Sequence, residues 1–228
     1  MNEEIIIVSL GGSLIIPEEI DKEFLKDFKK IILSQIKKGK KFVIITGGGK
    51  ICRKYQSVAK EIKGEMSSSE LDWLGIYSTR FNAEFMKILF SDLAEEEIIL
   101  DPTLPITLDK PMVFGGGWKP GWSTDYVSVM LAKQLKIKKI INLSNTDFVY
   151  DSDPKINPNA KKIEKISWKD YRDLIPAEWN PGLNTPFDPI ASKIAEEEEI
   201  EVVIMNGKLN ENFAKYLNKE EFKGTVIS

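Results

Sequence analysis

Histidine is absent from this 228-residue chain, and cysteine occurs once, at Cys52. Without histidine the chain lacks the usual metal ligand and the usual general base near pH 7, which argues against triad hydrolases, histidine zinc sites and histidine phosphotransfer. A lone cysteine excludes an internal disulfide. Any chemistry must therefore use lysine, arginine, aspartate, backbone dipoles or a bound Mg²⁺ ion.

Long apolar runs and a strong net charge are also missing. No run approaches the length of a membrane span, and the acidic start at residues 1–4 does not resemble a signal peptide. The net charge of −3 gives no indication of nucleic-acid or membrane binding. These absences predict a cytoplasmic protein, and the length suits one domain or two small lobes with a sizeable core.

Patterns typical of strands and helices alternate along most of the chain. Strands are expected at residues 5–10, 42–45, 98–100, 112–114, 139–143, 201–205 and 225–227. Helices are expected near residues 17–38, 50–62, 69–93, 125–135, 189–197 and 211–217, with residues 151–162 as a loop or small hairpin. This rhythm predicts an α/β fold, a three-layer αβα sandwich around a mostly parallel sheet.

Two of the predicted helices carry further signals. Pro17 is expected in the first turn of the first helix, with Gly39 closing its end. Ser68 or Ser69 is the expected N-cap of the helix near residues 69–93. The apolar residues of that helix fall on one stripe, which contains Leu71, Leu74, Phe81, Phe85, Ile88 and Leu89.

Three glycine-bearing segments follow predicted strands, at residues 10–13, 46–50 and 115–121. Glycines at a strand end let backbone N–H groups approach a ligand without a Cβ in the way. Three such ends on one edge of a parallel sheet would form a cradle for an anion. A phosphorylated substrate is therefore the first expectation.

The helix after the second glycine segment carries Arg53 one turn in, where its guanidinium would meet a phosphate above the glycines. On spacing alone, a surface salt bridge is an equally good interpretation of Arg53. The segment does not match a Walker A loop. By itself, it is therefore a weak signal.

Four glycines in seven residues make the third segment a loop that wraps a ligand or turns tightly, and Ser123, Thr124 and Asp125 then start a helix. N-capping explains one of these three polar residues, so a ligand loop is the favoured interpretation of the whole. Further on, Asp188 precedes Pro189 as an N-cap would, and Lys193 lies one turn inside the helix. Lys193 is either solvated or directed at a phosphate near the helix N-terminus.

Taken in order, these segments resemble the amino acid kinase family, and most closely its archaeal-type UMP kinases. The resemblance covers nearly the whole chain. Its pieces are Gly-Gly-Ser at 11–13, Gly-Gly-Gly-Lys at 47–50 with Arg53, the run 71–83, Pro-Gly-x-Ser-Thr-Asp at 120–125, the run 145–154, Asp-Pro-x-Ala-x-Lys at 188–193 and Gly-Thr at 224–225. Each piece is weak, but the ordered set is specific.

The resemblance implies one amino acid kinase domain over residues 1–228. It has an acceptor-binding lobe at about 1–135 and an ATP-binding lobe at about 136–228. The implied catalytic residues are Gly12, Arg53 and Lys193. The implied ATP site consists of Gly12, Ser13, Gly49, Arg53, Ser144, Asn145, Tyr150 and Asp153. The implied UMP site consists of Gly48, Asp72, Trp118, Lys119, Pro120, Gly121, Trp122, Ser123 and Thr124, and no residue is assigned as a metal ligand.

The implied reaction is in-line phosphoryl transfer from Mg²⁺–ATP to the phosphate of UMP, which gives UDP for pyrimidine biosynthesis. Such transfer needs positioning and charge neutralisation more than a base, in keeping with a chain that has no histidine. Arg80, eight residues beyond Asp72, is expected to support the UMP site. The family also implies a homo-oligomer, by analogy a hexamer.

Some positions depart from the family pattern. Ser9 stands where many members carry a lysine, Phe148 replaces a usual glycine, and Trp118 and Trp122 replace smaller or polar residues. Two alternatives therefore stay open. One is a kinase of the same fold acting on another small phosphate, such as isopentenyl phosphate, or on a carboxylate, although isopentenyl phosphate kinases use a histidine that is missing here. The other is a non-catalytic nucleotide- or oxyanion-binding relative.

Overall fold

The computed structural model describes residues 4–154, 156–177 and 185–228 of the chain. Its strands are β1 (Glu4–Leu10), β2 (Lys40–Thr46), β3 (Met112–Gly115), β4 (Lys139–Ser144), β5 (Val149–Tyr150), β6 (Lys162–Ile163), β7 (Lys165–Ile166), β8 (Glu201–Asn206) and β9 (Thr225–Ile227). Its helices are α1 (Gly12–Ile15), α2 (Lys22–Ile36), α3 (Gly49–Lys63), α4 (Ser68–Leu89), α5 (Thr124–Leu135), α6 (Trp168–Leu174), α7 (Pro189–Glu197) and α8 (Asn210–Leu217).

Seven strands form one sheet in the order β3-β2-β1-β4-β8-β9-β7. Every neighbouring pair is parallel except β8 and β9, which run antiparallel. The strands β5 and β6 form a separate antiparallel pair, so the expected small hairpin after residue 150 is confirmed. The mostly parallel sheet confirms the predicted fold class.

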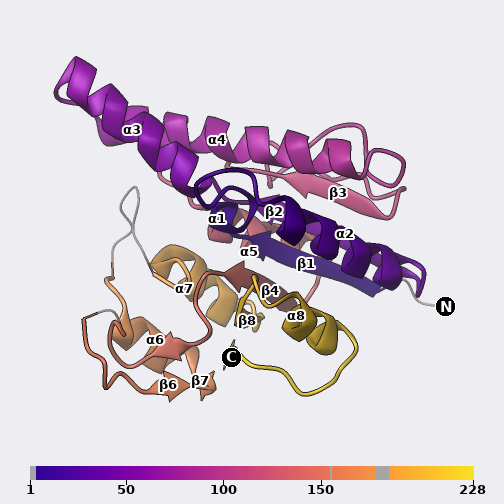
Figure 1. The fold of residues 1–228 in the computed structure, drawn as a ribbon. Coiled ribbons are helices and arrows are strands. Elements are labelled where there is room, and N and C mark those ends of the chain that lie inside the picture. The colour runs from indigo at the N-terminus through magenta and orange to yellow at the C-terminus, as the bar shows by residue number, and fades with distance from the viewer. Residues whose placement is uncertain (1–3, 155, 178–184) are drawn as a thin grey trace.

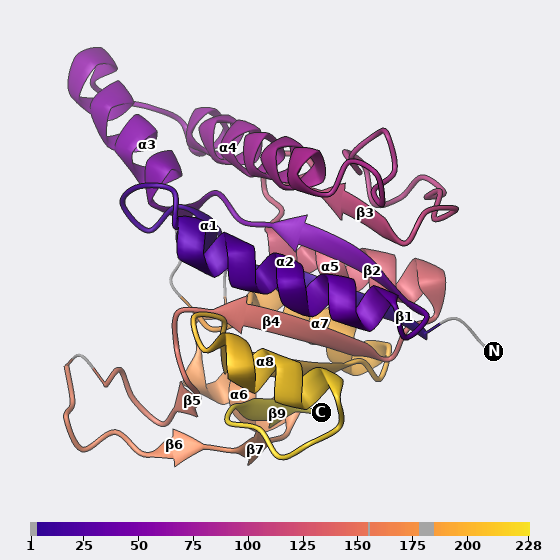
Figure 2. The ribbon, with the colours of Figure 1, turned by 45° about the vertical axis from the view of Figure 1, so that its right-hand side comes forward.

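Helices cover both faces of this sheet (Figures 1 and 2). One face packs against apolar residues of α1, α2, α4 and α8, and the other against those of α5, α6 and α7. Alternate residues of β1 enter the two cores, with Val8 on one side and Ile7 on the other. This period of two is what a strand buried on both faces requires.

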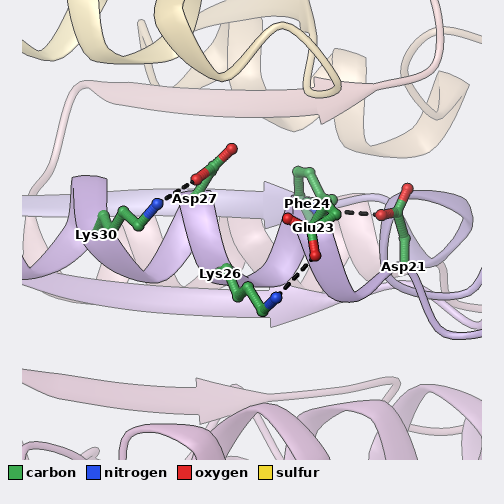
Figure 3. Close-up of polar contacts among 6 residues, drawn as sticks. All are labelled: Asp21, Glu23, Phe24, Lys26, Asp27 and Lys30. Atoms are coloured by element: carbon green, nitrogen blue, oxygen red, sulfur yellow. Dashed lines mark hydrogen bonds and ion pairs between the residues drawn. The ribbon is translucent and has the colours of Figure 1, made fainter.

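The first predicted helix is divided in two. Ile16 precedes Pro17, and the residue before a proline disfavours helical dihedrals, so α1 ends at Ile15. The longer α2 starts after Asp21, whose side chain accepts a 3.0 Å hydrogen bond from the N–H of Phe24. Figure 3 shows this cap and the exposed ion pairs Lys26–Glu23 and Lys30–Asp27, at 2.7 and 2.8 Å. The prediction that Pro17 lies in the first turn was therefore wrong.

Other differences are local. The N-cap of α4 is Ser67, which forms a capping box with Glu70, and not Ser68 or Ser69 as predicted; the helix ends at Leu89. The predicted single stripe of this helix is wrong for Phe81 and Ile88, which are exposed. The predicted strand at residues 98–100 is a single bridge from Ile99 to Gly115, with bends at residues 96–97 and at Leu100 on either side of it. The sequence patterns did not predict α6 or β7. Within the described part of the chain, no helix has the length and apolar character needed to cross a bilayer.

Candidate active site

The first two glycine segments pack against each other at the carboxyl ends of β1 and β2. A Cβ added to Gly12 would lie 2.3 Å from the carbonyl oxygen of Gly47 and 2.3 Å from the nitrogen of Gly49. Gly49 also has a φ of +71°, which favours glycine. The backbones can approach this closely only because neither segment carries side chains there.

A cleft of about 330 Å³ opens beside these glycines. Its lining comes from the ends of several parallel strands and from the first turns of α3 and α5, where main-chain N–H groups lack partners within the helix. The lining residues are Gly11, Gly12, Ser13, Gly47, Gly48, Gly49, Cys52, Arg53, Gln56, Asp72, Gly75, Ile76, Thr79, Gly117, Trp122, Ser123, Thr124, Asp125, Thr185 and Asp188. This arrangement is suited to an anionic ligand.

The helix α4 positions the loop that borders the cleft on its other side. Thr79 Oγ1 accepts a 2.6 Å hydrogen bond from the N–H of Gly117, and Asp72 Oδ2 accepts one of 2.7 Å from the N–H of Gly121. Arg80 donates to the carbonyl oxygens of Gly117 and Trp118 at 3.0 and 2.7 Å. Arg80 therefore holds this loop and does not line the cleft itself.

Two acidic residues face the cleft at the start of α5 and α7. Oδ1 of Asp125 accepts a 3.1 Å hydrogen bond from the hydroxyl of Ser9, and Oδ2 accepts one of 3.1 Å from the N–H of Asp188. Burial, and then the charge of Asp188, raise the pKa of Asp125 to about 7. Burial also raises the pKa of Asp188, although its bond from the N–H of Ala191 opposes the shift.

Three aromatic rings cluster at the loop of residues 116–123 and at the first turn of α5. The ring of Trp122 lies 4.0 Å from that of Tyr126, and Trp118 stacks on Tyr126 at 6.2 Å. The ammonium of Lys119 lies 3.8 Å from the centre of the Trp118 ring. Trp122 lines the cleft, whereas Trp118 and Lys119 do not. The two tryptophans, which the sequence could not distinguish, therefore have different positions.

The cationic side chains near the cleft differ in whether they already form an ion pair. Lys50 and Lys54 both form ion pairs with Glu18. The pKa of Glu18 is lowered, mainly by the hydrogen bond from Lys50. Arg53 lines the cleft, is exposed, and makes no ion pair or hydrogen bond within the described residues. Its guanidinium is thus available to a ligand.

Lys193 lies on α7, one turn beyond its N-cap. Its side chain is exposed and lines neither of the two clefts formed by the described residues near the carboxyl ends of the strands. Asp188 caps α7 with a 2.7 Å bond from the N–H of Ala191, and Pro189 is the first helical residue, as predicted.

A second cleft, of about 520 Å³, lies beyond β4. Four of its lining residues belong to the predicted ATP site, namely Ser144, Asn145, Tyr150 and Asp153. The remaining lining residues are Thr146, Asp147, Phe148, Val149, Asp151, Ser152, Pro154, Leu174, Ile175, Pro176, Thr185, Pro186 and Asn206. Thr185 lines both clefts, so the two are neighbours.

Most predicted site residues are thus brought together. The first cleft contains Gly12, Ser13, Gly48, Gly49, Arg53, Asp72, Trp122, Ser123 and Thr124. Of the predicted acceptor loop, Trp118, Lys119, Pro120 and Gly121 do not line it. Sequence reasoning did not assign Asp125 or Thr79 to the site. Asp125 belongs to the motif at 120–125 and Thr79 to the run 71–83, so the family resemblance offered a signal for both residues.

A sequence profile of the amino acid kinase family matches residues 4–107 and 112–206. The chain therefore belongs to the amino acid kinase family. It is 32% identical to a uridylate kinase of Thermoplasma acidophilum, over all of this chain and 97% of that one. It is 31% identical to the uridylate kinase of Thermococcus kodakarensis, with 97% and 98% of the two chains covered.

Solved structures agree with this assignment. The uridylate kinase of Archaeoglobus fulgidus superposes with a TM-score of 0.80 at 31% identity, covering 99% of this chain and all of the other. A UMP kinase of Ureaplasma parvum superposes over the full length of both chains with a TM-score of 0.78 at 24% identity. At that identity the second likeness bears on the fold alone.

Proposed function

We propose that the chain is a UMP kinase, which transfers the γ-phosphoryl group of ATP to UMP. The observation that carries the proposal is the pair of neighbouring clefts that share Thr185. One is lined by glycine backbone and Arg53 and suits a phosphate, and the other is lined by polar and aromatic side chains and suits a nucleoside. Relatives that cover nearly the whole chain are named uridylate kinases, which supports UMP as the acceptor.

In the proposed reaction, an oxygen of the UMP phosphate attacks the γ-phosphorus of ATP. A new P–O bond forms to UMP, the bond to the β,γ-bridging oxygen breaks, and ADP leaves. The acceptor oxygen is already anionic, so no base is needed. The site must instead hold two phosphate groups in line and offset their charge, and glycine N–H groups, helix N-termini and Arg53 are suited to do so.

The donor in this proposal is the Mg²⁺ complex of ATP. The described residues contain no cluster of three or more potential metal-ligating side chains, so phosphate oxygens would supply most ligands. Three carboxyl groups line the first cleft, those of Asp72, Asp125 and Asp188, and they are the side chains placed to add a further ligand. We also propose that Lys193 neutralises charge on the transferred phosphoryl group. The proposal includes two lobes, one for the acceptor at about 1–135 and one for ATP at about 136–228.

The acceptor half of the proposal rests on the loop held by α4. Asp72 is joined to this loop through the N–H of Gly121, and Trp122 supplies an aromatic wall beside it. An aromatic wall fits the planar base of a nucleotide better than a short alkyl or carboxylate acceptor. We also propose that the protein works as a homo-oligomer, with the hexamer resting on family resemblance alone.

A coupled ADP-release assay tests the proposal with UMP, CMP, isopentenyl phosphate and acidic amino acids as acceptors. Turnover with UMP well above that with the other compounds is the expected result. Turnover only with an alkyl phosphate or an amino acid would replace UMP as the acceptor. ATP binding measured by calorimetry, without turnover on any acceptor, would favour a non-catalytic relative.

A further inference from the structure

A cavity of about 370 Å³ lies at the amino ends of β1, β2 and β4. The last turn of α8 and the residues that follow this helix, Lys219, Glu220 and Phe222, complete its wall. In Figure 2, β1 runs from this end of the sheet towards α1 and the first glycine segment at the other end. The cavity is therefore remote from both clefts and belongs to neither proposed substrate.

Apolar side chains make up much of the cavity wall. Ile6, Ile141 and Leu217 are buried, and Ile5 and Ile137 are half-buried. The volume falls within the range of small-molecule sites, about 300–1,000 Å³. An apolar body of the size of one or two fused rings would be removed from water there.

The wall also contains a polar atom without a partner. Tyr216 packs edge-on against Phe222 with ring centroids 4.7 Å apart, and its buried hydroxyl makes no hydrogen bond within the described residues. The ammonium of Lys139 lies 6.0 Å from the centre of the Tyr216 ring, without hydrogen-bond geometry at the hydroxyl, and pairs with Glu201 at 2.7 Å. Burial raises the pKa of Tyr216, so the hydroxyl keeps its proton and can donate to an anion. Buried hydroxyls without partners are rare in proteins.

Three lysines line the cavity, against the two carboxylates of Glu4 and Glu220. The side chain of Lys40 is only 12% exposed, and its ammonium lies 3.7 Å from Glu4 and donates a 2.5 Å hydrogen bond to the carbonyl oxygen of Leu217. Burial lowers the pKa of Lys40; the charge of Glu4 opposes this shift, and the charge of Lys219 adds to it. Among the described residues, Lys219 is exposed and its side chain forms no ion pair or hydrogen bond. An anion near these two lysines would offset their repulsion.

We propose that this cavity is a ligand site for a small organic anion with a flat apolar body, such as an aromatic carboxylate or sulfonate. The apolar body would lie against Ile137, Ile141 and Phe222, and the anionic group would face Lys40 and Lys219. An inorganic ion would leave the apolar wall uncovered. A neutral apolar molecule would leave the lysines and the hydroxyl of Tyr216 without a partner.

The site is independent of the proposed reaction. Its test measures the binding of a probe and not turnover, so failure of this site and failure of the UMP kinase proposal give different results. The probe is anilinonaphthalenesulfonate, a flat apolar sulfonate whose fluorescence rises in apolar surroundings. It is titrated into the unaltered chain, Lys219→Glu and Lys169→Glu. Lys169 is the matched control because it is exposed, lies outside the cavity and gives the same change in net charge.

Saturable binding to the unaltered chain is expected, with no displacement by saturating ATP and UMP. Lys219→Glu should raise the Kd at least about ten-fold, because repulsion replaces attraction, whereas Lys169→Glu should leave it unchanged. Absence of saturable binding, displacement by the nucleotides, or one Kd shared by the two variants would overturn the proposal.

Tyr216→Phe covers the case in which Lys219→Glu does not fold, since it removes the hydroxyl and keeps the ring. Probe binding about five-fold weaker is expected, the usual effect of losing one hydrogen bond. The melting temperature of the ligand-free variant should equal or exceed that of the unaltered chain, because the hydroxyl gives up no partner. Unchanged probe binding, or a melting temperature well below that of the unaltered chain, would count against the site.

Discussion

The N–H of Asp188 donates a hydrogen bond of 3.1 Å to Oδ2 of Asp125, which joins the start of α7 to the start of α5. The hydroxyl of Ser9 completes the arrangement from β1 with a 3.1 Å bond to Oδ1. Three elements that are remote in sequence thus converge on one carboxyl group. Ser9, at the position of a lysine in many family members, serves here as a hydrogen-bond donor to that carboxyl.

The first prediction concerns pH. The pKa of Asp125 is raised to about 7 in the folded chain, against about 3.9 when unfolded. Between about pH 4 and 7 the folded state therefore binds the proton more tightly, and the free energy of unfolding falls as pH rises. Asp125→Asn should flatten this dependence by on the order of 4 kcal/mol. Urea unfolding from pH 4 to 7.5 measures it, with the exposed Asp109→Asn as control. An equal slope in both variants would contradict the assignment.

The second prediction concerns the packed glycines. Gly12→Ala should lower the free energy of unfolding by about 2 kcal/mol or more, since the new Cβ would overlap two backbone atoms. Gly75→Ala is the matched control because its Cβ would be 3.6 Å from Cys52 Sγ, an ordinary contact, and alanine favours a helix by up to about 1 kcal/mol. Denaturation of both variants tests this. Equal free energies of unfolding for the two variants would show that the contact at Gly12 leaves room for a Cβ.

The third prediction separates acceptor from donor. Arg53→Ala and Asp72→Ala should each raise the KM for UMP more than the KM for ATP. The first removes an unpaired guanidinium from the cleft, and the second releases the N–H of Gly121. Lys54→Ala is the control, since Lys54 pairs with Glu18 and does not line the cleft. Steady-state kinetics with each substrate varied tests this. If the affinity for ATP fell while the kinetics with UMP were unchanged, these two residues would belong to the ATP site and not to the UMP site.

The fourth prediction concerns Lys193. Lys193→Ala should lower kcat by roughly 10²- to 10³-fold, about 3–4 kcal/mol, if the ammonium acts as a charge clamp on the transferred group. Stability should change little because the side chain is exposed. Lys169→Ala, another exposed lysine, is the control. Single-turnover rates and melting temperatures measure both effects. An unchanged rate would remove Lys193 from the catalytic group.

Local patterns in the sequence were sufficient for most of the fold. Buried β-branched runs such as Phe42–Ile45 predicted strands, and Asp188 with Pro189 predicted a helix start, because these signals depend on near neighbours in the chain. The first helix differed from the prediction because Ile16, which precedes Pro17, disfavours helical dihedrals. The single bridge at Ile99 differed because it depends on pairing with Gly115, which no local pattern encodes. The short β7 forms only through pairing with β9, which no local pattern encodes.

For the site, the sequence by itself determined which residues are available: glycines after strands, Arg53 after the second of them, and no histidine. Tertiary structure alone decided that Trp122 lines the cleft while Trp118 does not, and that Ser9 and Asp188 meet at Asp125. It also decided that Phe81 faces solvent and Ala83 the core. The physical reason is that the sequence specifies where glycines let one backbone segment approach another or a ligand. The burial of a side chain, its partners and its pKa depend instead on packing between segments far apart in the chain.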